Sequence, residues 1–195
     1  MSAAGWAELV ALVALLAVTA PLLGRYMAHV YEGGPSRLDR VFGPVERLFY
    51  RACRIDPDRE QRWNIYALSF LAFSVVGVLL LYLMQRIQHG LPFNPTDMVN
   101  VAPALSFNTA VSFMTNTNWQ SYGGENTLSH LTQMMGLTVQ NFVSAAAGMA
   151  VMVAFIRGLS RAGQRTIGNF WVDLIRTTLR ILLPLSILFA VVLIT

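Results

Sequence analysis

Two threonine–asparagine pairs, set among apolar residues, carry the groups best suited to binding an ion. They are Thr115, Asn116, Thr117 and Asn118, and Trp119 follows at once. Asparagine adopts the left-handed backbone region more readily than most residues, so Asn116 and Asn118 can turn successive carbonyl oxygens toward one axis. Such carbonyls replace part of the hydration shell of an ion in selectivity filters. The pattern therefore predicts a cation filter here, with Thr115 and Thr117 supplying hydroxyls or packing behind it.

The residues after the filter are expected to support it. Trp119 is interpreted as a wedge that holds the filter strand, and Gln120 is expected to lie toward the outer mouth with Tyr122. Gly123 and Gly124 are interpreted as a flexible exit toward the next apolar stretch.

A short apolar run from Pro103 to Met114 must position this segment. As a helix it would be about 18 Å long at roughly 1.5 Å per residue, whereas a bilayer core requires roughly 20 apolar residues. Proline suits the first helical position, where its missing N–H costs nothing. The run predicts a re-entrant helix whose C-terminal end, near mid-membrane, carries about half a negative charge and attracts cations. On composition alone an ordinary extracellular loop is the commoner reading, but a plain loop does not require a helix-length apolar run before it.

The composition indicates an all-α integral membrane protein. Of 195 residues, 55% are hydrophobic and only 12% are charged, which excludes an ordinary soluble domain. Four apolar segments are long enough, or nearly so, to cross a bilayer. They are Trp6–Leu23, Ile65–Met84, Thr127–Ile156 and a stretch from Trp171 to the chain end.

Arginine placement predicts the orientation of these segments. All 14 basic residues are arginine, and one loop holds Arg25, Arg37, Arg40, Arg47, Arg51, Arg54, Arg59 and Arg62. A second group follows the third segment: Arg157, Arg161, Arg165, Arg176 and Arg180. Only Arg86 lies between the second and third segments. The positive-inside rule then places both arginine-rich loops in the cytoplasm and the N-terminus outside, so the net charge of +4 does not point to nucleic acid.

These segments divide the chain into five parts. Residues 1–31 form a leading transmembrane helix, 32–62 a cytoplasmic amphipathic loop, 63–156 a helix–pore helix–filter–helix repeat, 157–170 a cytoplasmic loop and 171–195 the first helix of a next repeat. Within the repeat, the pore helix covers 103–114 and the filter 115–119. Since Ile181–Thr195 gives only about 22 Å of helix, interrupted by Pro184, we expect the chain to be a truncated part of a longer protein.

The first loop contains apolar residues at helical spacing with arginines between them. They are Leu38, Val41, Val45, Leu48, Phe49 and Ala52. This pattern fits an amphipathic helix on the inner membrane surface and fits equally a small cytoplasmic helix packed against the rest of the protein.

Other polar residues favour structural readings. The third segment contains His130, Gln133, Gln140, Asn141 and Ser144, and polar residues inside a span more often link helices by hydrogen bonds than ligate an ion. The lone Cys53 matches no metal or nucleophile pattern.

Over its central part the chain resembles a known family. LSFNTAVSFMTNTNWQSYGGENTLSHLTQMMGLTVQNFVSAAAGMAV is similar to the first pore repeat of the potassium-binding A subunit of the Kdp potassium-transporting ATPase, and the resemblance continues through RTIGNFWVDLIRTTLRILLPLSI. It implies a potassium-channel-like fold of four helix–pore–helix repeats around one pore. It also implies that residues 115–118 match the filter of the first repeat, flanked by Trp119 and Gln120. The absence of glycine from 115–119 departs from the TVGYG filter of potassium channels.

The resemblance also implies how such a subunit works. Potassium would be captured from outside the bacterial cytoplasmic membrane and passed to a P-type ATPase subunit, which hydrolyses ATP. One or two small accessory subunits complete the complex, and the subunit itself carries no ATP site and no cofactor. One repeat out of four cannot form a complete filter, so this chain alone should neither conduct nor select potassium.

Three other functions remain as alternatives. A membrane enzyme would require a nucleophile or metal constellation, whereas His29, His89 and His130 are scattered and no HExxH, GxSxG or P-loop motif occurs. A structural or assembly fragment without transport activity is favoured by the truncation itself. A passive channel would differ only in lacking an ATPase partner.

Overall fold

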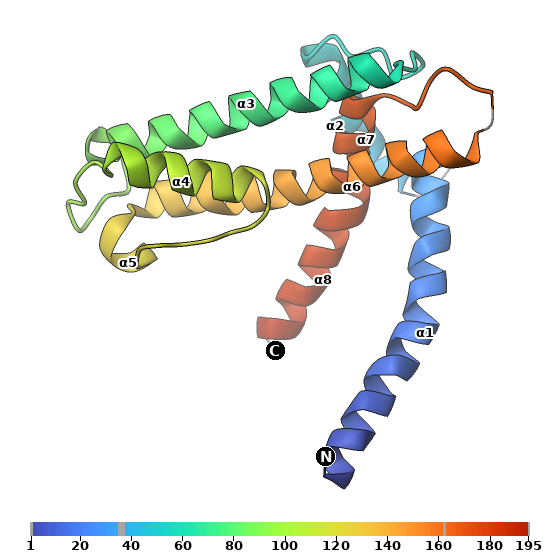
Figure 1. Ribbon diagram of the computed structural model, residues 1–195, viewed down its shortest axis with the longest axis horizontal. Helices are drawn as coiled ribbons and strands as arrows, with labels where there is room; N and C mark the ends of the chain where they lie inside the picture. Colours follow the sequence, from blue (N-terminus) through green and yellow to red (C-terminus); the bar gives the residue numbers. More distant parts are fainter. Residues whose placement is uncertain (1, 35–37, 162, 195) are drawn as a thin grey trace. The chain divides into compact units, whose positions relative to one another are not determined.

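The computed structural model describes residues 2–34, 38–161 and 163–194, and this part of the chain is all-helical (Figure 1). The helices are α1 (Ala3–Glu32), α2 (Asp39–Ala52), α3 (Trp63–Ile87), η1 (Gln88–Gly90), α4 (Pro103–Met114), α5 (Gly124–Thr127), η2 (Thr132–Thr138), α6 (Val139–Ser160), α7 (Phe170–Arg176), η3 (Thr177–Leu182) and α8 (Leu183–Ile194). η1 is a 3-10 turn, whereas η2 and η3 are wider π-helical turns. Residues 1–45 form one compact unit and residues 46–195 a second.

Four of these helical stretches are long and apolar enough to cross a membrane. They are Ala4–Glu32, Trp63–Gly90, Thr132–Ser160 and Phe170–Ile194. The all-α fold and the four apolar segments predicted from the sequence are therefore confirmed. Three of the stretches begin before the predicted segments, whereas the third begins at Thr132 instead of Thr127 and ends at Ser160 instead of Ile156.

The first helix extends beyond its predicted apolar segment. The apolar segment ends near Leu23, after Pro21, whereas α1 continues to Glu32, one residue beyond the end expected for the leading helix at residue 31. It stops at Gly33, whose left-handed φ of 73° ends the helix. Proline is tolerated inside apolar spanning helices because neighbouring groups compensate for the lost hydrogen bond. At the other end, the Ser2 side chain accepts a hydrogen bond from the Gly5 N–H.

The loop between the first two spans contains the expected helix, α2. Within the second unit, Glu46 and Tyr50 are buried, and Nη2 of Arg180 in η3 lies 2.7 Å from Oε2 of Glu46. Burial and the charge of Glu46 raise the pKa of Tyr50 to about 12. Leu48 and Phe49 remain exposed. One face of α2 is therefore packed against the protein, and the membrane-surface location of its exposed apolar face stays a prediction.

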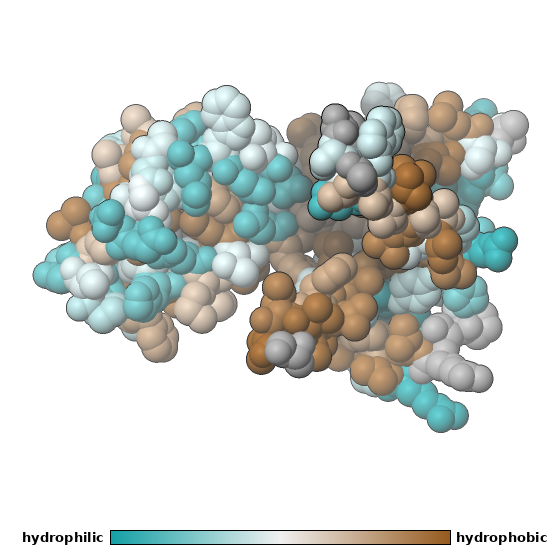
Figure 2. Space-filling model, turned by 90° about the horizontal axis from the view of Figure 1, so that it is seen from below, coloured by the Kyte–Doolittle hydropathy of each residue, from teal (hydrophilic) through white to brown (hydrophobic). Residues whose placement is uncertain are grey.

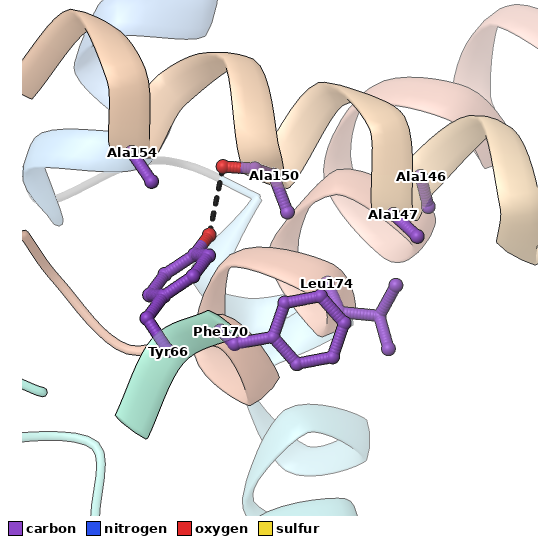
Figure 3. Close-up of a cluster of buried hydrophobic side chains, with 7 residues drawn as sticks. All are labelled: Tyr66, Ala146, Ala147, Ala150, Ala154, Phe170 and Leu174. Atoms are coloured by element: carbon purple, nitrogen blue, oxygen red, sulfur yellow. Dashed lines mark hydrogen bonds between the residues drawn. The ribbon is translucent and has the colours of Figure 1, made fainter. Parts of the chain in front are cut away.

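In the second unit α4 lies between one end of α3 and of α6, with α5 close by (Figure 1). The opposite ends of α3 and α6 pack against α7 through an aromatic and alanine cluster (Figure 3). In that cluster the Phe170 ring meets the Tyr66 ring edge-on at 5.6 Å, and the Tyr66 hydroxyl lies 2.7 Å from the Ala150 carbonyl oxygen. The alanines of α6 permit this close approach, so the cluster fixes α3, α6 and α7 relative to one another.

A buried ion pair reinforces the same junction. Arg157 of α6 and Asp173 of α7 form a bidentate pair, with N–O distances of 2.6 and 3.0 Å. Their side chains are only 11% and 2% exposed. Gly168 adopts a φ of 103°, and a Cβ there would overlap Nη1 of Arg157, so glycine makes room for the guanidinium.

The helix limits revise the predicted placement of several arginines. Arg25 lies inside α1, Arg157 inside α6, Arg176 at the end of α7 and Arg180 in η3. The loop assigned to 157–170 is therefore shorter, because α6 runs on to Ser160 and α7 begins at Phe170. The predicted third segment ended at Ile156 because the next residue, Arg157, is charged. Hydropathy alone does not show that Asp173 neutralises it. Arg37, also counted in the first loop, lies outside the described residues.

Candidate functional site

The short helix α4 covers Pro103–Met114, with Pro103 at its first position, which confirms the bounds expected from the sequence. Its polar residues Ser106, Thr109 and Ser112 are buried, as are Phe113 and Met114 at its end. One side of α4 is therefore packed against α3 and α6, whereas Phe107 on the other side is 59% exposed.

Two glutamines at the end of the second span hold the beginning of α4. Gln85 is fully buried, and its Nε2 donates to the Ser106 carbonyl at 3.3 Å. Gln88 is also fully buried, and its Nε2 donates to the carbonyls of Val99 and Thr127 at 2.6 and 2.8 Å. Gln88 therefore ties the loop before α4 to the end of α5.

The C-terminal end of α4 is fixed by a close approach of α3. The Sδ atom of Met114 accepts a hydrogen bond from Nε2 of Gln140 in α6 at 2.9 Å. A Cβ on Gly77 of α3 would lie only 2.6 Å from that sulfur. Glycine at 77 therefore lets α3 pass close to the end of α4, and Gln140 links helices as the sequence reading favoured.

The threonine–asparagine segment, Thr115–Asn118, folds back on the last turns of α4. The Thr115 N–H donates to the Val111 carbonyl at 2.9 Å, and the N–H groups of Thr117 and Asn118 both donate to the Ser112 carbonyl, at 2.9 and 3.2 Å. The next N–H, of Trp119, donates to the Ser112 hydroxyl oxygen at 2.5 Å. Ser112 thus anchors the segment through its backbone and its side chain.

The backbone of this segment alternates in handedness. Asn116 and Asn118 have φ values of 56° and 59°, whereas Thr115 has a φ of −81°. The left-handed conformation predicted for both asparagines is confirmed. Because the N–H groups turn back to α4, they leave the carbonyl side free, and within the described residues no hydrogen bond reaches the carbonyl oxygens of 115–118. The segment therefore presents unpaired carbonyl oxygens next to the C-terminal end of a helix.

The side chains of the segment support this backbone. The Thr115 hydroxyl donates to the Val111 carbonyl at 2.9 Å and lies 2.8 Å from the Thr117 hydroxyl. Oδ1 of Asn116 accepts from the Ser144 hydroxyl of α6 at 3.3 Å. The threonine hydroxyls are thus engaged with α4 and with each other, and Ser144 links the segment to the third span.

The flanking residues lie on the surface of this chain. The Trp119 side chain is 74% exposed, so a partner for a wedging ring does not occur among the residues that the structure describes. Gln120 is exposed, and its Nε2 donates to the Tyr122 hydroxyl at 3.4 Å. Burial raises the pKa of Tyr122, which keeps its phenol neutral. Polar side chains gather over the end of the second unit that carries α4 and α5 (Figure 2).

Several residues that position the segment were not found from the sequence. Ser112 looks like any small polar residue in an apolar helix, and its role depends on where the chain turns after Met114. Gln85 and Gln88 offered a signal, because two glutamines three residues apart end an otherwise apolar span. The predicted flexible exit at Gly123–Gly124 instead leads directly into α5, which begins at Gly124.

Replacing Ser112 with alanine tests the anchor. The change keeps the backbone acceptor but removes the Oγ partner of the Trp119 N–H, and an orphaned donor costs roughly 1–3 kcal/mol. If the segment is the cation filter that the sequence predicts, this loss should weaken ion binding by the full-length protein at least about fivefold, measured as the half-saturating ion concentration. Ser106→Ala removes a buried hydroxyl from the same helix far from the segment, and a loss of equal size there would contradict the anchor.

Comparison with known proteins identifies the family of this chain. The family model described as "Potassium-transporting ATPase A subunit" matches residues 10–195. A protein of Mycobacterium tuberculosis (strain H37Rv), named "Potassium-transporting ATPase potassium-binding subunit", is 59% identical over 196 residues, covering 100% of this chain and 34% of that protein.

Two further relatives carry the same name. The protein of Rhodospirillum centenum is 57% identical over 194 residues, covering 100% of this chain and 34% of its own length. The protein of Sorangium cellulosum is 58% identical over 184 residues, covering 94% of this chain and 32% of its own length. The chain thus spans about a third of the length of the curated relatives it matches, and it belongs to the family of potassium-transporting ATPase A subunits.

Proposed function

We propose that residues 115–119 form one quarter of a potassium filter, and that the chain is the first part of the potassium-binding subunit of an ATP-driven uptake pump. In this proposal α4 dips into the membrane from outside and returns through the segment to the same side. Its length of 12 residues gives about 18 Å of helix, too short to cross. Potassium is the cargo of this site.

The observation that carries the proposal is the unpaired row of carbonyl oxygens beside the end of α4. Alternating handedness at Asn116 and Asn118 aligns carbonyls in the way that an ion replacing its hydration shell requires. The C-terminal end of α4 adds about half a negative charge from its dipole. Both features favour a cation, and neither by itself discriminates potassium from sodium.

The other parts of the pump follow from the family. We propose that three further repeats of the full-length subunit complete the ring of filter segments. Potassium then passes to a P-type ATPase subunit that hydrolyses ATP, assisted by small accessory subunits in a bacterial cytoplasmic membrane. Five arginines within the segment 46–62, namely Arg47, Arg51, Arg54, Arg59 and Arg62, favour the cytoplasmic side for that loop, which would leave α4 and α5 facing outward.

Alanine substitutions at Asn116 and Thr117 test the filter. Asn116→Ala places a residue with Cβ but no amide in the left-handed region, which costs about 1–2 kcal/mol. Thr117→Ala removes the hydroxyl contact with Thr115, worth about 1 kcal/mol. We expect each variant of the full-length protein to need roughly fivefold more potassium for half-maximal uptake, with normal membrane insertion. Thr96→Ala, in the loop before α4, serves as the control. If both filter variants showed unchanged uptake at limiting potassium, the segment would be an ordinary surface loop.

A charge at Gln120 tests whether the filter mouth lies beside it. Gln120→Arg places a cation near the ion path, and repulsion of about 1 kcal/mol at a few ångströms in a wet site should weaken potassium affinity about fivefold. Gln120→Met removes the hydrogen bond to Tyr122 without adding charge. Equal half-saturating potassium concentrations for the arginine and methionine variants would place Gln120 away from the path.

A further inference from the structure

The opposite end of the second unit contains a pocket that the potassium site does not use. It has a volume of about 660 Å³ and is lined by the loop after α2 and by the first turns of α3 and α7. Three arginines line it, Arg54, Arg59 and Arg62. Among the residues that the structure describes, none of these three forms an ion pair. The pocket therefore offers three guanidinium groups that form no ion pair within the described residues.

The two acidic residues that line the pocket are already engaged. The Glu60 carboxylate accepts hydrogen bonds from Arg161, at 2.9 Å, and from the Thr166 hydroxyl. The Thr166 hydrogen bond and Arg161 hold the pKa of Glu60 below its usual range. Oδ1 of Asp56 accepts from the Asp58 N–H at 3.1 Å. Since Arg161 neutralises Glu60, the three arginines exceed the remaining acid.

The arginine-bearing loop is held rigidly. Gln61 N–H donates to the Gly168 carbonyl at 2.7 Å, and Ile167 N–H donates to the Gln61 carbonyl at 3.0 Å. The Asn169 amide donates to the Arg59 carbonyl at 3.0 Å. These bonds join the loop to the chain that precedes α7, so the pocket is preorganised and keeps its arginine backbone in place without a ligand.

An apolar groove adjoins the pocket. It has a volume of about 270 Å³ and shares Cys53, Ile55 and Trp171 with the pocket. Its other walls include Phe49 of α2, Val143 of α6 and the side chains that η3 and α7 present. A charged pocket and an apolar groove that share a wall match an amphipathic ligand with an anionic head and a hydrocarbon tail.

The location of the pair fits one source for that ligand. The pocket borders the first turns of α3 and α7, which are ends of two helical stretches able to cross a membrane, and the groove continues from it along α7. Trp63, 71% exposed, and Trp171 lie at these ends, where tryptophan concentrates at headgroup level. A membrane phospholipid reaches this level with its phosphate in water and its chain in hydrocarbon.

We propose that the pocket and groove bind one anionic phospholipid, with its phosphate among Arg54, Arg59 and Arg62 and an acyl chain in the groove. Guanidinium groups bind phosphate oxygens in a bidentate manner, and the strength of attraction to anionic lipids grows with each arginine near the surface. The site is separate from the potassium segment, so its test can fail while the potassium proposal stands.

Photo-crosslinking to the full-length protein in its detergent-solubilised complex tests the site. The probe is a phosphatidylglycerol with a photoreactive group on its acyl chain, and labelled peptides are mapped by mass spectrometry. We expect labelling within the stretch 174–179, where Leu174, Ile175, Thr178 and Leu179 line the groove. Arg59→Gln with Arg62→Gln should raise the half-saturating probe concentration about 25-fold, from about fivefold for each arginine. No labelling in this segment would mean that protein, and no lipid, fills the groove, and would overturn the proposal.

Matched variants separate the site from general surface charge. Arg165→Gln removes the same charge from an exposed position outside the pocket and should leave labelling unchanged. Arg54→Gly removes a lining charge at a residue with a φ of 53°, where glycine relieves backbone strain, so reduced labelling there would not reflect misfolding. Equal losses in Arg165→Gln and in the Arg59 and Arg62 double variant would overturn the site.

Two further arms identify the ligand. Unlabelled phosphatidylglycerol should compete with the probe, whereas phosphatidylcholine should compete at least fivefold more weakly. Inorganic phosphate at millimolar concentration should not displace the probe, and full displacement would assign the pocket to free phosphate. Ile175→Trp should fill the groove and reduce labelling, whereas Ile187→Trp, on an exposed part of the same span, should not. Labelling unaffected by Ile175→Trp would contradict the acyl-chain location.

Discussion

Replacing Asp173 with asparagine is expected to destabilise the full-length subunit by about 3–5 kcal/mol, because it leaves a buried arginine without its counter-charge. The Arg157 guanidinium is bound to both oxygens of Asp173 at 2.6 and 3.0 Å, and neither side chain is more than 11% exposed. The Tyr66 hydroxyl, 3.1 Å from Oδ2 of Asp173, would lose part of its environment as well. The measurement is the temperature at which half of the purified complex remains soluble after heating.

Two controls separate the effect of a stranded buried charge from other causes of instability. Glu60→Gln breaks an ion pair with Arg161 at 2.9 Å whose side chains are 35–40% exposed, and exposed pairs contribute at most about 1 kcal/mol. Asp173→Leu combined with Arg157→Met removes both charges of the buried pair, and apolar replacement of a whole pair is often neutral or stabilising. If the double variant were as unstable as Asp173→Asn, the loss would come from packing and not from the stranded charge.

Local chemistry explains what could be predicted of the candidate site. Pro103 set the beginning of α4 because proline suits a first turn, and the left-handed φ of Asn116 and Asn118 follows from the tolerance of asparagine for that region. Such features depend on a few neighbouring residues. The bounds of α4 and the conformation of the segment were therefore accessible from the sequence alone.

Features that depend on distant residues were not accessible. The pairing of Arg180 with Glu46 joins residues 134 positions apart, and hydropathy alone could only treat Arg180 as a charge near a span. Gly77 gave no signal, because its role is to admit Met114 from another helix. The pattern of residues in the sequence thus located the helices, whereas contacts between distant residues determine which side chains position the segment Thr115–Asn118.

The handedness of residue 116 separates a backbone site from a side-chain site. Asn116→Val places a β-branched residue at a φ of 56°, where L-residues pay about 1–2 kcal/mol and branched ones are true outliers. We expect about thirtyfold weaker potassium affinity in the full-length complex, which corresponds to the upper end of that range. Asn116→Gly keeps the left-handed backbone and loses only the hydrogen bond from Ser144, worth about 1 kcal/mol.

The glycine variant should therefore remain within about fivefold of the parent in the potassium dependence of uptake. Asn126→Val, an exposed asparagine in α5 without a left-handed φ, controls for a valine on the same side of the protein and should leave potassium affinity unchanged. If glycine and valine at 116 weakened affinity equally, the Asn116 amide and not the direction of the carbonyls would bind the ion. The alternating backbone would then serve only to turn the chain after α4, because its free carbonyl oxygens would add nothing to the ion binding that the side chain provides.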